Sequence, residues 1–341
     1  MNDHTMARAS PWSLSPIGHR LTMTVAAALA FLFGAVAPTH FAGEFALKLA
    51  DEGLLLGILA LSVAFLMSQS GLVALGAASV YGGVGYLFAN GVALAGLSPS
   101  LALLVALAVA IVYSALLGAL IIRTNPLAFM MLTLAAGQMV SHSVMLEGLR
   151  DYTSGADGLV VSFDGRVFGL QAADFANPAR FWPIAWGAAW LAGLAVWVVR
   201  RSRLGAVLRA IRANEERMRF SGFDTYLPRL AAFVFVSVIA AICGLLHVLN
   251  AGFVSPESLG LSVSTNALVA ALIGGTAGSV GPIAGGVLFT FAQDQFGARD
   301  LTQLLTGAAI VVFIVLFPRG IVGGLFDATA RLVAPKSKAR R

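Results

Sequence analysis

Long apolar runs separated by short polar segments make up most of the chain. A helix of about 20 apolar residues crosses the hydrocarbon core of a bilayer. Most runs have that length or come near it, and 54–67 is short enough that its helix is expected to extend back toward Phe45. The candidate spans are 21–37, 54–67, 72–89, 97–122, 126–146, 181–199, 230–250, a broken segment 267–292, and 301–317.

Composition agrees with this pattern. Apolar residues make up 58% of the chain, charged residues only 11%, and the mean hydropathy is +0.86. A soluble domain carries about 25% charged residues, and outer-membrane barrels show short alternating segments instead of long runs. The sequence therefore predicts an all-α polytopic membrane protein with about 8–10 transmembrane helices, one of them broken or re-entrant.

One polar segment, 200–229, differs from the others in charge. It holds eight arginines against three acids, and basic residues beside a span stay in the cytoplasm. Leu204, Val207, Leu208, Ile211 and Met218 mostly follow the spacing of one helix face. We therefore expect an amphipathic cytoplasmic helix that docks a soluble partner. The alternative is a helix that lies on the anionic membrane surface.

Charge in the other loops sets the expected orientation. Segment 147–180 has five acids and three arginines, which suits the outside, whereas the C-terminal tail is basic. The predicted organisation is a cytoplasmic tail 1–20, a transmembrane domain 21–325 and a basic cytoplasmic tail 326–341. The domain includes a periplasmic loop 147–180 and a cytoplasmic coupling loop 200–229. The net charge of +6 reflects this sidedness rather than a nucleic-acid partner.

Residues 273–286, IGGTAGSVGPIAGG, interrupt the segment 267–292. Glycine and proline break helices, and irregular backbone at membrane depth is buried in protein or lines a wet cavity. A break that returns the chain also places the C-terminus in the cytoplasm. Tight helix packing and helix-bridging hydrogen bonds are the alternative roles. The predicted translocation-path residues are Gln138, Asn266, Gly274, Gly275, Thr276, Gly278, Ser279 and Pro282.

Several function classes receive little support. No Walker A motif or hydrolase motif occurs, and Cys243 stands alone in an apolar run. We expect no catalytic site, no cofactor and no metal. None of the candidate spans carries a central charged residue, which argues against an ion-coupled secondary transporter. That transporter class, and a membrane enzyme or scaffold, stay open as alternatives.

Six blocks in order carry a family resemblance. They are RTNPLAFMMLTLAAGQ (123–138), TSGADGL (153–159), NEERMRFSG (214–222), GFVSPES (252–258), GGTAGSVGPIAGG (274–286) and FPRGIVGGL (317–325). Over about 54–325 the chain resembles permease subunits of ABC importers for branched-chain amino acids, of the LivM type. It departs from them in the loop at Arg217, Met218 and Phe220, and in the Gly-rich segment 71–85.

The resemblance implies a multi-pass permease of the bacterial inner membrane. Its implied partners are a second permease subunit in a heterodimer, two cytoplasmic ATPases and a periplasmic solute-binding protein. Branched-chain amino acids are the first candidate solutes. Urea, short amides and aromatic or other carboxylates are alternative solutes that stay open. The implied ATPase-coupling residues are Asn214, Glu215, Glu216, Arg217, Met218 and Gly222.

Overall fold

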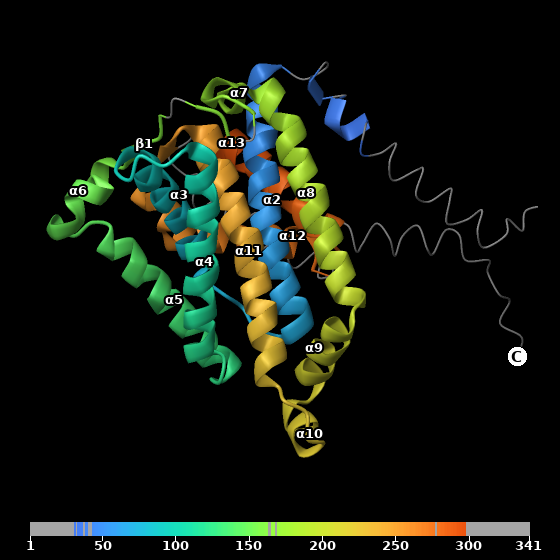
Figure 1. Ribbon diagram of the computed structural model, residues 1–341. Coiled ribbons are helices and arrows are strands. Elements are labelled where there is room, and N and C mark those ends of the chain that lie inside the picture. Colours follow the sequence, from blue (N-terminus) through green and yellow to red (C-terminus); the bar gives the residue numbers. More distant parts are fainter. Residues whose placement is uncertain are drawn as a thin grey trace, which may run out of the picture. The chain divides into compact units, whose positions relative to one another are not determined.

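A computed structural model describes residues 43–162, 165–167, 169–276 and 278–297, together with 31, 33–36, 38 and 39. The chain divides into two compact units, Met1–Ala42 and Gly43–Arg341. In the first unit the described residues are helical. The described part of the second unit is almost entirely helical and carries every feature discussed below (Figure 1).

Eight helices build the body of the second unit. They are α2 (Glu44–Ser70), α3 (Ala77–Ala93), α4 (Pro99–Ile121), α5 (Pro126–Ser143), α8 (Pro178–Arg201), α11 (Tyr226–Ala251), α12 (Leu261–Gly274) and α13 (Val280–Gly297). Short elements connect them: η1 (Glu147–Leu149), α6 (Arg150–Thr153), η2 (Gly155–Asp157), β1 (Leu159–Val160), α7 (Ala172–Ala176), α9 (Arg203–Ala213), α10 (Glu215–Phe220), β2 (Phe253–Val254) and η3 (Pro256–Leu259).

The long apolar helices confirm the predicted class, an all-α polytopic membrane protein. Among the described residues, α2, α4, α8 and α11 are long and apolar enough to cross a membrane. A fifth span is reached when α5 and residues 147–157, bent by 71°, count as one. Predicted spans 72–89 and 267–292 fall on α3, α12 and α13, which do not pass the same test. Span 301–317 and most of 21–37 lie outside the described residues.

Helix α2 forms the centre of the described bundle and packs against α8, α11, α12 and α13. It begins at Glu44, so the expected extension of 54–67 toward Phe45 is confirmed. The extension brings Asp51 inside the helix, where it is fully buried. Neither carboxylate oxygen has a hydrogen-bond partner in the described part of the chain. The longer helix therefore adds a buried carboxylate that lies outside the candidate span 54–67.

Glycines bring α13 close to α2. A Cβ placed on Gly53 would lie 2.8 Å from the Cα of Val287, and one on Gly57 would lie 2.6 Å from the carbonyl oxygen of Ile283. A Cβ on Gly286 would overlap the backbone of Gly57. Small residues permit this approach of helix backbones, and it increases dispersion contact between helices in a bilayer.

The broken segment predicted at 267–292 is confirmed as two helices, α12 and α13. Helix α12 ends at Gly274, and Gly275 adopts a φ of 91° that favours glycine. Helix α13 then folds back on α12. The two backbones come so close that a Cβ on Gly285 would meet the carbonyl oxygen of Ala270. The break is shorter than the glycine run, since Gly281, Gly285 and Gly286 lie inside α13. Those three glycines serve close packing.

The two polar loops lie at opposite ends of this unit (Figure 1). At one end, Leu159 and Val160 of β1 pair with β2, and the Thr153 hydroxyl donates to the carbonyl of Val144 at 2.6 Å. The backbone N–H of Gln171 and the side chain of Arg180 hold the pKa of Asp174 below its usual value. Helices α9 and α10 lie at the other end. This separation is the arrangement expected of loops on opposite sides of a membrane.

Candidate functional site

The arginine-rich loop contains two helices, so the expected single amphipathic helix is wrong. Helix α9 ends at Ala213, and α10 begins after Asn214, whose φ is −162°. The Asn214 side chain accepts a hydrogen bond of 2.9 Å from the backbone N–H of Arg217. An asparagine that caps the next helix in this way competes with continued helical bonding. The apolar face is confirmed in α9, where Leu208 and Ile211 are buried.

Arginines of α9 bind the end of α2. Arg209 donates to the side-chain oxygen of Gln69 at 2.9 Å and to the carbonyl of Arg200 at 2.8 Å. Arg212 donates to the carbonyl of Ser68. The last carbonyls of a helix are unpaired and attract cations, so these contacts join α9 to the central helix of the bundle.

Arg200, at the end of α8, joins three elements. Its Nη2 donates to the hydroxyl of Ser68 at 2.9 Å and to the carbonyl of Thr276 at 2.9 Å. Thr276 lies in the turn between α12 and α13. The guanidinium group therefore connects the start of the loop, the end of α2 and the glycine-rich break through charge-assisted hydrogen bonds.

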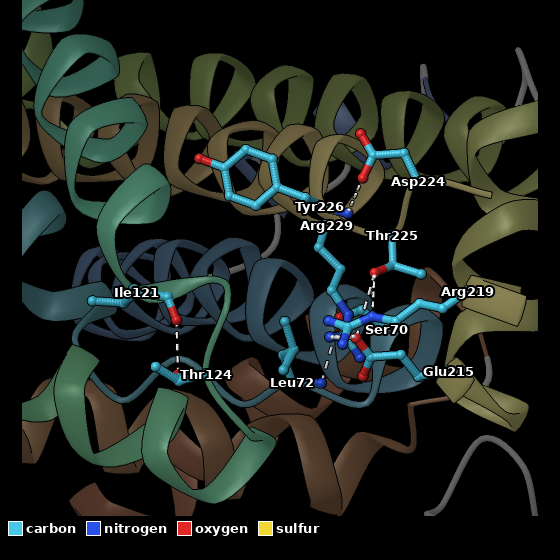
Figure 2. A network of polar contacts seen from close by, with 10 residues as sticks. All are labelled: Ser70, Leu72, Ile121, Thr124, Glu215, Arg219, Asp224, Thr225, Tyr226 and Arg229. Carbon is cyan, nitrogen blue, oxygen red and sulfur yellow. Dashed lines mark hydrogen bonds and ion pairs between the residues drawn. The ribbon is translucent and has the colours of Figure 1, made fainter. Parts of the chain in front are cut away.

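Glu215 is the centre of a second network (Figure 2). Its Oε1 lies 2.8 Å from Nη1 of Arg229 in α11 and 3.0 Å from Nη2 of Arg219 in α10. The Thr225 hydroxyl also donates to Glu215, at 3.4 Å. Arg229 is only 5% exposed, and a buried charge needs a partner. Glu215 therefore has its ion-pair partners within the chain.

The outer surface of α10 and the turn after it carries exposed aromatic side chains. Phe220 is 89% exposed and Phe223 is 55% exposed. Glu216 and Arg217 beside them are exposed, Met218 is half-buried, and Gly222 has a φ of 79° in the turn. Exposed apolar groups rimmed by polar residues mark interaction sites. Sequence reasoning assigned no role to these two phenylalanines, although two aromatics in a polar loop were a usable signal.

The predicted translocation-path residues do not lie in one place. Gly274, Gly275, Thr276, Gly278, Ser279 and Pro282 gather at the turn between α12 and α13, next to Arg200. Gln138 lies on α5 and Asn266 lies on α12, both half-buried. None of the eight lines the cavity of about 250 Å³ between α3, α4 and α5. The α12–α13 turn lies beside the start of the arginine-rich loop, where Arg200 contacts Thr276. The role of these residues in solute passage stays a prediction.

Cys243 is fully buried in α11, and its thiol donates to the carbonyl of Leu55 at 3.0 Å. This is the small core residue that its position in an apolar run indicates. Among the described residues no group of three or more His, Cys, Asp or Glu side chains is placed to hold a metal ion.

Helices that can span a bilayer, with two polar loops at opposite ends and a basic loop bound to the bundle, define a multi-pass membrane protein. The chain belongs to the family of branched-chain amino acid transport system permease components, whose pattern matches residues 45–314.

Individual relatives are distant. The branched-chain amino acid permease protein LivM of Escherichia coli K12 is 25% identical over 289 residues, which are 78% of this chain and 67% of that protein. LivH of the same strain is 24% identical over 191 residues, 54% of this chain and 62% of that protein. The xylose permease protein XylH of the same strain is 36% identical over 98 residues, 28% of this chain and 25% of that protein. No solved structure matches the chain.

Proposed function

We propose that this chain is a membrane-spanning permease subunit of an ATP-binding-cassette importer in a bacterial inner membrane. The observation that carries the proposal is the family match over residues 45–314. The match with LivH covers 62% of that protein's length, so the activity, solute and partners are proposed for this chain on the basis of likeness. ATP hydrolysis takes place on separate chains in this proposal.

The proposed assembly has a second permease, two cytoplasmic ATPases and a periplasmic binding protein. The surface of α10 supports an ATPase partner, because Phe220 and Phe223 expose apolar area beside the charged Glu216 and Arg217. Glu215 has a different role: its bonds to Arg219 and Arg229 fix α10 against α11. A membrane-surface position for the amphipathic helix is less favoured, because the apolar face of α9, with Leu208 and Ile211, is already buried in the protein, whereas an interfacial helix buries that face in lipid.

The contacts of Arg200, Arg209 and Arg212 suggest how ATPase movement reaches the membrane part. When ATP binding moves the loop, α9 pulls on the end of α2 through Ser68 and Gln69. Arg200 transfers the same motion to the turn at Thr276. Because α13 packs on α2, the two helices move together, and the bundle opens outward to receive solute.

The proposed solutes are branched-chain amino acids. LivM and LivH are named for that transport and each matches more of this chain than XylH, which is named for xylose transport. An ion-coupled secondary transporter is the alternative that Asp51 would favour, since it is a buried carboxylate in α2. Uptake by the chain in liposomes without any ATPase would distinguish that transporter from an importer subunit.

Charge reversal in α10 tests the proposed docking surface. In the co-expressed importer, we expect Glu216→Lys to lower ATPase co-purification and uptake at least tenfold with the thermal stability of the permease unchanged, because Glu216 is exposed. The matched variant Glu215→Lys should lower thermal stability, because it leaves the buried Arg229 without its anion. Normal assembly and uptake in the double variant Glu215→Lys/Glu216→Lys would contradict the docking role.

A further inference from the structure

Two segments singled out by the sequence, 153–159 and 252–258, meet at the end of the bundle opposite the arginine-rich loop (Figure 1). The first leads into β1 and the second contains β2, and the two strands pair antiparallel. The backbone N–H of Val161 donates to the carbonyl of Gly252 at 2.8 Å, which extends the pairing. The proposed function assigns no role to the ribbon that these segments form.

The ribbon has an inner and an outer face. Val254 is 1% exposed and its pairing partner Leu159 is half-buried, so this pair faces the protein. Val160 is 75% exposed, and Phe253, directly opposite it, is 38% exposed. Because successive residues of a strand point to opposite faces, the outer face of the ribbon is an exposed apolar pair.

Two acids lie at one end of the ribbon. Because the strands are antiparallel, the segment before β1 and the segment after β2 leave the same end. Asp157 lies just before β1, Glu257 lies just after β2, and both side chains are exposed. Among the described residues neither acid forms an ion pair. The exposed apolar pair therefore has negative charge beside it that no described cation neutralises.

Close packing fixes the ribbon on the bundle. Gly158 has a φ of 71°, and a Cβ there would lie 2.5 Å from the carbonyl oxygen of Val254. A Cβ on Gly82 of α3 would lie 2.8 Å from the carbonyl of Ser258, so η3 is seated directly on α3. A surface that is fixed before binding loses less conformational entropy when a partner docks, and its contact with α3 connects it to the helices.

We propose that this ribbon docks the periplasmic solute-binding protein of the importer. Val160 and Phe253 contact apolar side chains of that protein, and the two acids face its lysines or arginines. The inference rests on the proposed function and gives one of its partners a place on the chain. Protein interfaces combine an apolar centre with a polar rim, and exposed apolar groups beside polar ones mark interaction sites. The ribbon and the α10 surface lie at opposite ends of the unit, as partners on opposite sides of a membrane require.

The membrane surface is a less favoured occupant of the ribbon. Val160 and Phe253 suit the apolar part of a bilayer, but anionic phospholipid head groups would repel Asp157 and Glu257. Deeper insertion would remove water from both carboxylates, which is unfavourable. A soluble protein with basic side chains offers apolar contact and opposite charge together.

The test uses the importer with its second permease and ATPases in nanodiscs, to which solute-loaded binding protein is added. The readout is the binding-protein concentration that half-maximally stimulates ATP hydrolysis, at low and at high salt. Asp157→Lys/Glu257→Lys reverses the charge, and Val160→Ser removes apolar surface. The matched control is Glu44→Lys, since Glu44 is an exposed acid at the start of α2, whose other end binds α9.

We expect the double reversal to raise the half-maximal concentration at least tenfold at low salt, because like charges then oppose docking. Salt screens exposed charges, so added salt should weaken docking to the wild type and strengthen docking to the double variant. Damage to the fold would not produce this opposite salt dependence. Val160→Ser should raise the half-maximal concentration about threefold to tenfold, with Val160→Ile and Glu44→Lys within twofold of the wild type.

Half-maximal concentrations in the double variant and in Val160→Ser equal to that in Glu44→Lys would overturn the inference alone. Loss of the second permease from the purified Val160→Ser complex would assign the ribbon to the contact between permeases and overturn it too. Unchanged affinity for the binding protein with an altered dependence on anionic phospholipid would assign the ribbon to the membrane. A wild-type importer whose ATP hydrolysis the binding protein does not stimulate would overturn the proposed function first, and the inference with it.

Discussion

Gly286→Ala is expected to destabilise the folded permease. A Cβ at this position would overlap the backbone nitrogen and Cα of Gly57, so α13 must move away from α2. Overpacking of this kind costs about 1–3 kcal/mol and occasionally more, which exceeds the gain of about 1 kcal/mol from alanine in a helix. The measurement is the midpoint of thermal unfolding in detergent, read by the loss of monodisperse protein.

Gly187→Ala is the matched control for that prediction. Gly187 also lies within a helix, α8, and a Cβ there would meet nothing within 4 Å. The control should unfold at the wild-type temperature or slightly above it, because alanine stabilises a helix relative to glycine by at most about 1 kcal/mol. Equal midpoints for Gly286→Ala and Gly187→Ala would show that α2 and α13 do not pack as closely as described.

Arg200→Ala is expected to uncouple ATP hydrolysis from uptake in the assembled importer. The substitution removes the bonds to Ser68 and to Thr276, each worth about 1.5–3 kcal/mol when the donor is charged. The loop would keep the α10 surface that is proposed to dock the ATPase, but it would lose its connection to the α12–α13 turn. We expect uptake per ATP hydrolysed to fall at least tenfold, with ATPase co-purification unchanged.

Arg201→Ala serves as the control because Arg201 is the exposed neighbour, with its guanidinium 4.2 Å from the ring centre of Trp197. Arg200→Lys should give an intermediate value, since the lysine ammonium keeps the charge but does not place its nitrogen where Nη2 of Arg200 lies. Coupling in Arg200→Ala equal to that in Arg201→Ala would remove Arg200 from the proposed route.

Sequence patterns predicted helices well where a long apolar run decides the outcome. Runs 97–122, 181–199 and 230–250 correspond closely to α4, α8 and α11. The short run 54–67 was expected to extend toward Phe45, and α2 does continue through Lys48, Asp51 and Glu52. When burial stabilises a helix along most of its length, a few polar residues near its end also adopt the helical conformation.

The candidate site was only partly predictable. The basic loop and its apolar face were visible from spacing, and Leu208 and Ile211 are buried. The break at Asn214 depends on one side chain capping α10, which competes closely with helix continuation. The bonds of Arg200 to Ser68 and Thr276 join positions 132 and 76 residues apart. No local pattern encodes such pairs, and the cavity of α3, α4 and α5 is equally a product of tertiary packing.

The glycine run shows how one pattern served two purposes. Gly275 permits the turn, with its φ of 91°, as a helix break requires. Gly281, Gly285 and Gly286 lie in α13 against neighbouring backbone. Sequence alone could not divide the run between these uses, because glycine favours both a break and a close helix contact.

The measurement that tests the central claim most directly is uptake of labelled leucine into liposomes that contain this chain. Uptake is compared for the chain alone and for the chain with its second permease, two ATPases and binding protein, with and without ATP inside the reconstituted system. The account predicts uptake only in the complete assembly, only with ATP, and abolished when the ATPases cannot hydrolyse it. Uptake by the chain alone, driven by an ion gradient, would contradict the account and identify a secondary transporter.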